Sequence, residues 1–563
     1  MKRNLAILLV AAFVTALPFA LRRPRAVGAW REGDPVLVVI SPHIASIREE
    51  FERGFSAWHL ARHGAPVRID WRNVGGTTEI MRYLGGELDA SFRAWWAQTG
   101  HDSPADSPEA RAALAATDDP AAFTTKIDVF FGGGTYDHGR AGRLGLTVRP
   151  WPEGAEPPGV LADEDGRETF PAGRGGEVWR DGVFYSAVLS AFGICHNPDR
   201  LRDLGIAEPP VRWRDLADPR YAGQVGVTDP TKSGSIAKAF EMIVHSECHR
   251  AVREAGFPRE EVRRHEEAIA AAGGAVPPEL AAYQAAVERG WKDGIDLLRF
   301  IGANARYFTD GASKVALDVS SGDAAAGITI DFYARVQADV TRDPATGRER
   351  MAYVTPEGGS SVSGDPVSLL RGAPHRELAE RFLEYVLGPD GQRLWNYRPG
   401  EPGGPARHAL RRLPVRREYY PAGVAEWPAP QGGDAAVLAA IPAAHAAHTS
   451  DPLGDPAVDA YRLSGAFDYV PRWTAAHFGF LRLLVRSMCM DAGPELKEAW
   501  RAIAGAGGPG ACPEAMEALC RLPPGLDWAS APVLARGSAM DLSREWTVFF
   551  RDSYREAAAL ARR

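Results

Sequence analysis

Continuous apolar runs alternate with amphipathic stretches in the first part of the chain. Residues 36–40 form an unbroken apolar run, which is typical of a strand buried on both faces. Residues 44–58 then place apolar side chains three or four positions apart, as on one face of a helix. Strand patterns return at residues 67–71 and 127–131, with a helix start at residues 75–79 between them. This alternation predicts a doubly wound α/β lobe.

A second set of alternating elements follows. Residues 183–190 and 192–195 are predicted as two strands and residues 224–228 as a third. In residues 317–335, small residues lead into the β-branched run 328–330, which stops at Asp331-Phe332-Tyr333. We therefore expect a second α/β lobe, whose last strand delivers a carboxylate and a phenol to its carboxyl end.

The domain organisation follows from these patterns and from a length of 563 residues, which is too great for one core. Lobe 1 is expected to comprise residues 35–145 and 356–398. Lobe 2 is expected to comprise residues 146–355, with a helical insertion at 250–290. Residues 399–563 are rich in loop-forming residues and then helical, which predicts a C-terminal extension.

The first 30 residues have the pattern of an export signal or a membrane anchor. Lys2 and Arg3 precede a mostly apolar run at residues 5–21, and further arginines follow it. A run of this length is at the short edge of the roughly 17–25 residues that span a bilayer. We expect the body of the protein to be periplasmic or otherwise extracytoplasmic, either released or tethered by this segment.

Charge and cysteine content exclude some classes of function. A formal net charge of -7 gives no sign of a nucleic-acid-binding protein, which would carry a basic domain or stripe. The five cysteines form no C-x-x-C pair, so their spacing does not indicate a zinc site.

Clusters of glycine, hydroxyl and acidic residues directly follow predicted strands or open predicted helices in both lobes. Backbone N–H groups at such helix starts favour anions, so the clusters predict a ligand-binding cleft between the lobes. The candidate ligand-binding residues are His43, Thr77, Thr78, Gly132, Gly133, Gly134, Thr135, Ser233, Ser235, Asp331 and Tyr333.

The chain offers little support for catalysis. Its sequence contains no G-x-S-x-G, no G-x-x-x-x-G-K-[ST] and no H-E-x-x-H. No nucleophile is positioned beside Asp331 or His43 by the sequence. We therefore expect no catalytic residues, and a cleft enzyme is the weakest of the three functional hypotheses.

Five ordered motifs lie at residues 129–134, 193–197, 213–219, 229–235 and 376–395. Together they resemble the extracellular solute-binding proteins of ABC importers, in the type II branch that includes ferric-ion, phosphonate and polyamine binders. The resemblance covers roughly residues 36–400. It implies two α/β lobes joined by crossing strands, hinge closure on a solute, an ABC permease as membrane partner, and a monomer.

The resemblance also implies ligand positions, from which this sequence departs. His43 matches a histidine common in ferric binders, but Tyr333 is followed by Ala334 where those proteins place a tyrosine pair, and Gly133-Gly134 replaces an expected acidic ligand. Ferric iron, bound as cargo by His43, Asp331 and Tyr333, is therefore the alternative ligand. An anionic or zwitterionic organic solute is the principal expectation, and no resident cofactor is expected.

A second hypothesis keeps this fold but changes the partner. The large C-terminal extension and the N-terminal segment suit a ligand-sensing adaptor that signals to a membrane partner other than a permease.

Overall fold

The computed structural model describes residues 30–101, 103–428, 435–534 and 538–563. The expected export signal or membrane anchor lies outside these residues. None of the helices in the described ranges is both long and apolar enough to cross a bilayer.

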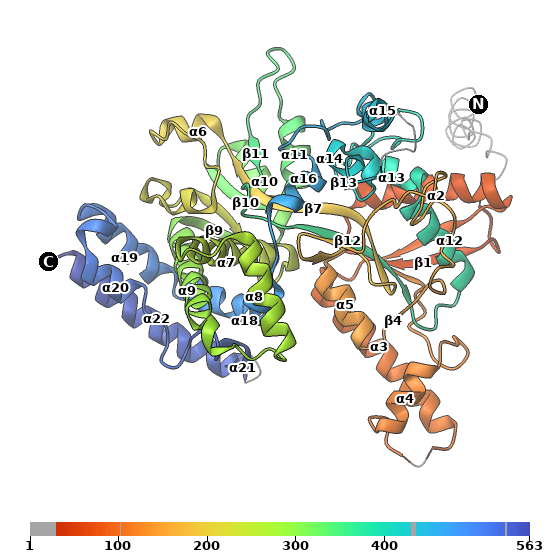
Figure 1. The fold of residues 1–563 in the computed structure, drawn as a ribbon, viewed down its shortest axis with the longest axis horizontal. Coiled ribbons are helices and arrows are strands. Elements are labelled where there is room, and N and C mark those ends of the chain that lie inside the picture. Colours follow the sequence, from red (N-terminus) through yellow and green to blue (C-terminus); the bar gives the residue numbers. More distant parts are fainter. Residues whose placement is uncertain (1–29, 102, 429–434, 535–537) are drawn as a thin grey trace, which may run out of the picture.

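An eleven-stranded sheet runs through both lobes, with the strand order β2-β1-β3-β12-β7-β10-β8-β9 along its main path. Figure 1 shows β7 and β12 at the centre of the molecule, between the two lobes. The strands are β1 (Val36–Ile40), β2 (Arg68–Arg72), β3 (Val129–Phe131), β4 (Thr147–Val148), β7 (Phe184–His196), β8 (Val225–Thr228), β9 (Ala305–Thr309), β10 (Ala326–Ile330), β11 (Ala352–Val354), β12 (Val362–Leu370) and β13 (Leu413–Pro414).

The lobe 1 sheet is covered on both faces, as the apolar runs predict. Alternate residues of β3 point to opposite sides: Val129 and Phe131 join the main hydrophobic core, whereas Phe130 joins a separate core. The helices of this lobe are α2 (Ala45–His63), α3 (Thr77–Gln98), α4 (Pro108–Ala116), α5 (Thr135–Arg143), α12 (Arg376–Leu387) and α13 (Pro389–Asn396). The doubly wound arrangement is confirmed.

The lobes are joined by crossing strands. Residues 184–191 of β7 pair antiparallel with β12, and residues 192–196 of the same strand pair antiparallel with β10 of lobe 2. The prediction of two separate strands at 183–190 and 192–195 was therefore wrong. Ser190, Ala191 and Gly193 weaken the apolar pattern at the crossover, but backbone pairing to two different partners keeps this strand continuous.

Lobe 2 carries helices α7 (Gly234–Glu254), α8 (Arg259–Ala271), α9 (Ala281–Asn304), α10 (Ala312–Ser321) and α11 (Asp331–Val340). Parallel strands β10, β8 and β9 lie between them. The segment 250–290, expected as an insertion, holds α8 and the beginning of α9. Buried side chains such as Trp291 make α9 part of the core.

The C-terminal extension is helical, as expected, and lies beside α7 and α9 of lobe 2 (Figure 1). Trp500 donates a hydrogen bond to the Asn304 side chain at 2.8 Å and stacks on Phe300. Its main helices are α18 (Phe478–Val485), α19 (Gly493–Gly505), α20 (Pro513–Leu519) and α22 (Ala539–Ala561).

Candidate functional site

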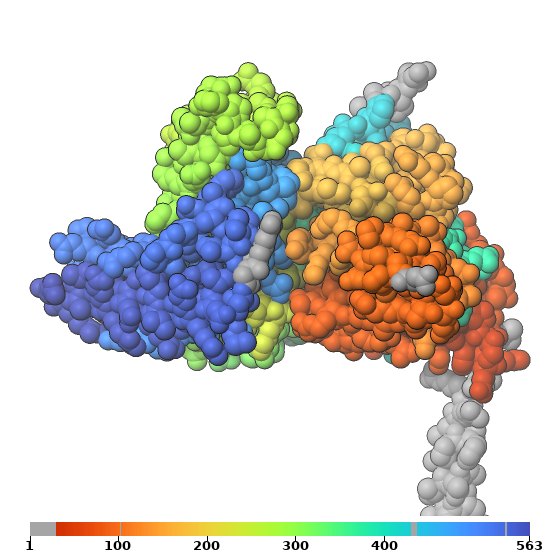
Figure 2. Space-filling view, turned by 90° about the horizontal axis from the view of Figure 1, so that it is seen from below, coloured from red at the N-terminus to blue at the C-terminus, as the bar shows by residue number. Residues whose placement is uncertain are grey.

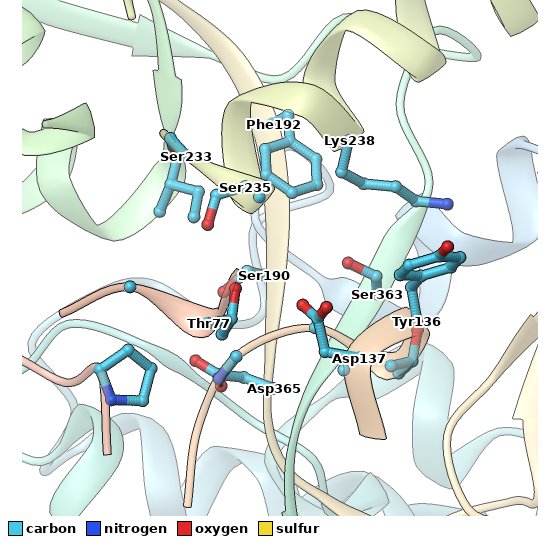
Figure 3. A pocket seen from close by; sticks show the side chains of 18 of the residues that line it. Thr77, Tyr136, Asp137, Ser190, Phe192, Ser233, Ser235, Lys238, Ser363 and Asp365 are labelled. Carbon is cyan, nitrogen blue, oxygen red and sulfur yellow. Dashed lines mark hydrogen bonds between the residues drawn. The ribbon is translucent and has the colours of Figure 1, made fainter. Parts of the chain in front are cut away.

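A cavity of about 600 Å³ lies between the lobes, next to the crossing strands. Figure 3 shows Ser233 and Ser235 on one side of it and Thr77, Tyr136 and Asp137 on the other. Each group comes from the start of a helix, since α3, α5 and α7 all begin at the cavity.

The lobe 1 wall is built by the glycine turn after β3. Gly133 has φ of +112°, a conformation that favours glycine, and its N–H donates to the Asp365 carboxylate at 2.5 Å. Gly134 precedes α5 and supplies no side-chain cap, so the first N–H groups of α5 are left at the cavity edge. This helix start can accept a negatively charged group.

The lobe 2 wall is the start of α7. The Ser233 hydroxyl caps this helix by accepting a hydrogen bond from the Ile236 N–H, at 3.3 Å. Ser235 in the first turn also lines the cavity. Hydroxyl groups and helical N–H groups therefore face the α5 start across the cavity.

A buried ionic cluster lines the cavity at the crossing strands β7 and β12. The Arg412 side chain, 1% exposed, donates to Asp365 at 2.5 Å and to the Ser190 hydroxyl at 2.7 Å. His43 Nε2 lies 3.2 Å from the same Asp365 carboxylate. Burial alone would raise the pKa of Asp365, but Arg412 and His43 outweigh it and hold that pKa well below its ordinary value.

His43 is neutral in this cluster because burial lowers its pKa. With Nε2–H donated to Asp365, Nδ1 is left as a hydrogen-bond acceptor. Nδ1 of His43 and Nε of Arg412 have no hydrogen-bond partner among the described residues. The cluster thus retains one hydrogen-bond acceptor, His43 Nδ1, and one donor, Arg412 Nε, which its internal hydrogen bonds do not use.

A second charged cluster lines the cavity on the lobe 2 side. Lys238 lies 3.1 Å from Glu177 and 3.0 Å from Glu241. Its ammonium group also lies 3.8 Å from the centre of the Tyr469 ring. Burial lowers the pKa of Lys238, but the two carboxylates have the larger combined effect and raise it, so the lysine stays charged.

Most of the sequence-predicted ligand residues meet at this cavity. Those that line it are His43, Thr77, Gly133, Gly134, Thr135, Ser233, Ser235 and Tyr333. Three others do not line it. Gly132 accepts a hydrogen bond from His138, and Thr78 accepts one from Arg482.

Asp331 is the third residue outside the cavity lining. It begins α11, is fully buried, and accepts hydrogen bonds from the backbone N–H groups of Ala191 and Phe332. The structure therefore does not bring the carboxylate of Asp331 into one cavity with His43 and Tyr333. In the described ranges, no group of three or more His, Cys, Asp or Glu side chains is arranged to hold a metal ion.

Several cavity residues were missed from the sequence. Asp365 stands within the mostly apolar stretch 362–370, and this charge was the available signal. Arg412 reaches the cavity because β13 pairs with Leu189 and Val188 of β7. That pairing joins distant segments, and no local pattern indicates it.

Comparison with known proteins agrees with the motifs. Residues 177–414 match the family described as bacterial extracellular solute-binding protein. An uncharacterized protein of Haemophilus influenzae is 25% identical over 210 residues, which are 37% of this chain and 46% of the relative. The phosphoglycerate transport regulatory protein PgtC of Salmonella typhimurium is 23% identical over 209 residues, 37% of this chain and 40% of the relative. The chain thus spans less than half the length of these curated relatives.

Solved structures with a related arrangement include periplasmic binding proteins. AfuA of Actinobacillus pleuropneumoniae, with fructose-6-phosphate bound, has a TM-score of 0.41 at 17% identity, over 64% of this chain and 81% of that chain. PotD of Streptococcus pneumoniae, from a spermidine/putrescine ABC transporter, has a TM-score of 0.43 at 12% identity, over 81% and 99%. Over residues 177–414, the chain is similar in sequence to the bacterial extracellular solute-binding proteins.

Proposed function

We propose that this protein is the extracytoplasmic solute-binding component of an ABC import system and captures a small anionic or zwitterionic solute between its lobes. The observation that carries the proposal is the meeting of two helix starts, those of α5 and α7, across one cavity of about 600 Å³. A volume in the range of about 300–1,000 Å³ is usual for small-molecule sites.

The solute would bind with an anionic group between the two helix starts. Thr135, Ser233 and Ser235 would supply hydroxyl groups beside the backbone N–H donors. Asp137 in the first turn of α5 also lines the cavity, and burial raises the pKa of its carboxyl group. Lys238 with its two glutamates would contact a polar or cationic group at the other end of the solute.

The name of the Salmonella relative is consistent with a phosphorylated carboxylate as ligand. The word "regulatory" in that name also favours the second candidate, a ligand-sensing adaptor that signals to a membrane partner other than a permease. Both candidates involve binding without turnover, and in both the body of the protein lies outside the cytoplasmic membrane.

A thermal-shift screen tests the proposal. It would compare 3-phosphoglycerate, sugar phosphates, phosphonates, polyamines and ferric salts, the last because His43 and Tyr333 both line the cavity. A ligand that binds only the folded state at 100 times its Kd stabilises by about 2.7 kcal/mol, which raises the melting temperature. An anion should give the largest rise. No rise with any small solute would contradict solute capture, and turnover of a stabilising compound would favour an enzyme.

A further inference from the structure

The C-terminal extension is part of the cleft. Four residues of one segment line the cavity together with both lobes, namely Tyr469, Pro471, Ala475 and Phe478. Figure 2 shows the C-terminal residues, in blue, on the same face of the molecule as residues of lobe 1, in red and orange. The segment 469–482 thus reaches from one lobe to the other.

The extension is fixed to lobe 2 by buried polar contacts. Arg472 pairs with Glu266 of α8 at 2.6 Å, and Trp473 donates to the same carboxylate at 3.0 Å. The Tyr469 hydroxyl donates to Glu241 of α7 at 2.6 Å. These buried or half-buried contacts make the extension and lobe 2 one packed unit.

The same segment also touches lobe 1, through two contacts. The Phe478 ring lies 4.8 Å from the Tyr136 ring of α5. Arg482 donates to the Thr78 hydroxyl of α3 at 3.2 Å, and also to the backbone carbonyls of Pro230 and Thr231 in lobe 2, at 2.7 and 2.9 Å. Arg482 therefore bridges the lobes directly.

The lobes are in close approach where this bridge forms. A Cβ atom added to Gly76 of lobe 1 would lie 3.5 Å from the carbonyl oxygen of Lys232 in lobe 2. One added to Gly234 would lie 3.1 Å from the Thr77 hydroxyl. Rotation of the lobes apart would therefore separate Thr78 from Arg482 and Tyr136 from Phe478.

We propose that the segment 469–482 is the third wall of the solute site and that Phe478 and Arg482 are positioning residues that hold the lobes together. The contacts of Phe478 and Arg482 with lobe 1 require the lobes to lie close together. They therefore shift the equilibrium between an open and a closed arrangement of the lobes toward the closed one. The inference that the segment 469–482 helps to enclose a solute rests on the proposed function. The inference that Phe478 and Arg482 hold the lobes together does not.

The test measures the distance between the lobes without any solute. Spin labels at Glu87→Cys of α3 and Glu288→Cys of α9, both exposed positions, report lobe separation by double electron–electron resonance. The half-buried Cys512 and Cys520 are replaced by serine in this background. The parent should give one short-distance population, and Tyr136→Ala with Arg482→Ala should add a longer one. An unchanged distribution in that variant, or a parent that is already mainly open, would overturn the proposal.

Two controls separate this effect from a loss of folding. Arg486→Ala removes an arginine four residues further on, which pairs with Asp491 at 3.6 Å, and should leave the distances unchanged. Thr78→Val removes only the acceptor hydroxyl at nearly constant volume, and should add a smaller long-distance population at an unchanged melting temperature. If the longer population appears but no solute binds the parent, the bridge is supported and the proposed function fails.

Discussion

Arg412 and Asp365 form a buried ion pair in a wall of the cavity. Replacing Arg412 with methionine leaves the Asp365 carboxylate without its strongest cationic partner. Loss of one member of a buried pair costs about 3–5 kcal/mol, because the remaining charge stays desolvated. We expect a fall in the melting temperature, measured by circular dichroism.

Arg555→Met is the matched control. Arg555 pairs with Glu495 at 3.0 Å, but its side chain is 61% exposed. An exposed pair contributes at most about 1 kcal/mol, so this variant should melt near the parent. Equal melting temperatures of Arg412→Met and Arg555→Met would show that the Arg412–Asp365 ion pair does not stabilise the fold.

His138 provides a test of pH dependence. Its ring on α5 is fully buried, and burial lowers its pKa to about 4. The Nε2–H group donates to the Gly132 carbonyl at 3.1 Å, and Nδ1 of the neutral ring accepts a hydrogen bond from the Ser368 hydroxyl at 2.7 Å. The unfolded chain, with a histidine pKa of about 6.5, binds more protons than the folded chain between these values. The contribution of His138 to the free energy of unfolding is therefore fully present above about pH 6.5 and is lost as the pH falls toward about 4.

The expected loss from His138 between pH 7 and pH 5 is about 2 kcal/mol. His138→Gln, which keeps a donor and an acceptor, should show a weaker dependence of the melting temperature on pH over this range. Equal slopes for parent and variant would mean that His138 is not buried as a neutral ring.

At the scale of elements, the glycine turn before α5 sets the shape of the anion-binding wall. A Cβ on Gly133 would lie 2.4 Å from the methyl group of Thr77, and the backbone there has φ of +112°. We expect Gly133→Ala to destabilise the protein by about 1–3 kcal/mol, through strain at this turn. Chemical denaturation followed by tryptophan fluorescence measures the change.

Gly86→Ala in α3 is the control variant for Gly133→Ala, because an unstrained glycine is replaced. Gly86 is exposed in the helix, and an added Cβ would have nothing within 4 Å. Alanine there should stabilise by about 0.5–1 kcal/mol. If Gly133→Ala were as well tolerated as Gly86→Ala, the turn would not constrain the site.

The elements of each lobe were largely predictable from the sequence, because their patterns are local. The runs at 36–40 and 328–330 became parts of β1 and β10, and the helix start at 75–79 became that of α3 at Thr77. Asp331 does directly follow a strand, as expected. However, its carboxylate accepts hydrogen bonds from the backbone N–H groups of Ala191 and Phe332 and does not line the cavity, and sequence position does not determine that choice.

Long-range features of the site could not be predicted. Arg412 comes from a loop-rich segment that pairs with β7, and Tyr469 comes from the extension. Lys238 and Glu241 are three residues apart on α7 and meet through the helix itself, whereas only the fold brings Glu177 to Lys238. Ion pairs between segments that are distant in sequence leave no periodic signal in the chain.

At the scale of the whole molecule, the cavity combines three segments that are distant in sequence: the starts of the lobe helices, the crossing strands, and the segment 469–482. A solute that contacts both lobes would stabilise the closed arrangement, because an open cleft offers only half of its contacts. Binding and lobe closure should therefore be coupled.

Titration calorimetry is the most direct test of solute capture in this cavity. The anion giving the largest thermal shift would be titrated into the parent, into the double variant Thr135→Val, Ser235→Ala, and into a Ser321→Ala control at the end of α10. We predict a Kd at least about tenfold weaker for the double variant, a loss of about 1.4 kcal/mol, with an unchanged melting temperature before ligand is added. The control should bind like the parent. Equal affinity in the parent and the double variant would contradict binding between the starts of α5 and α7.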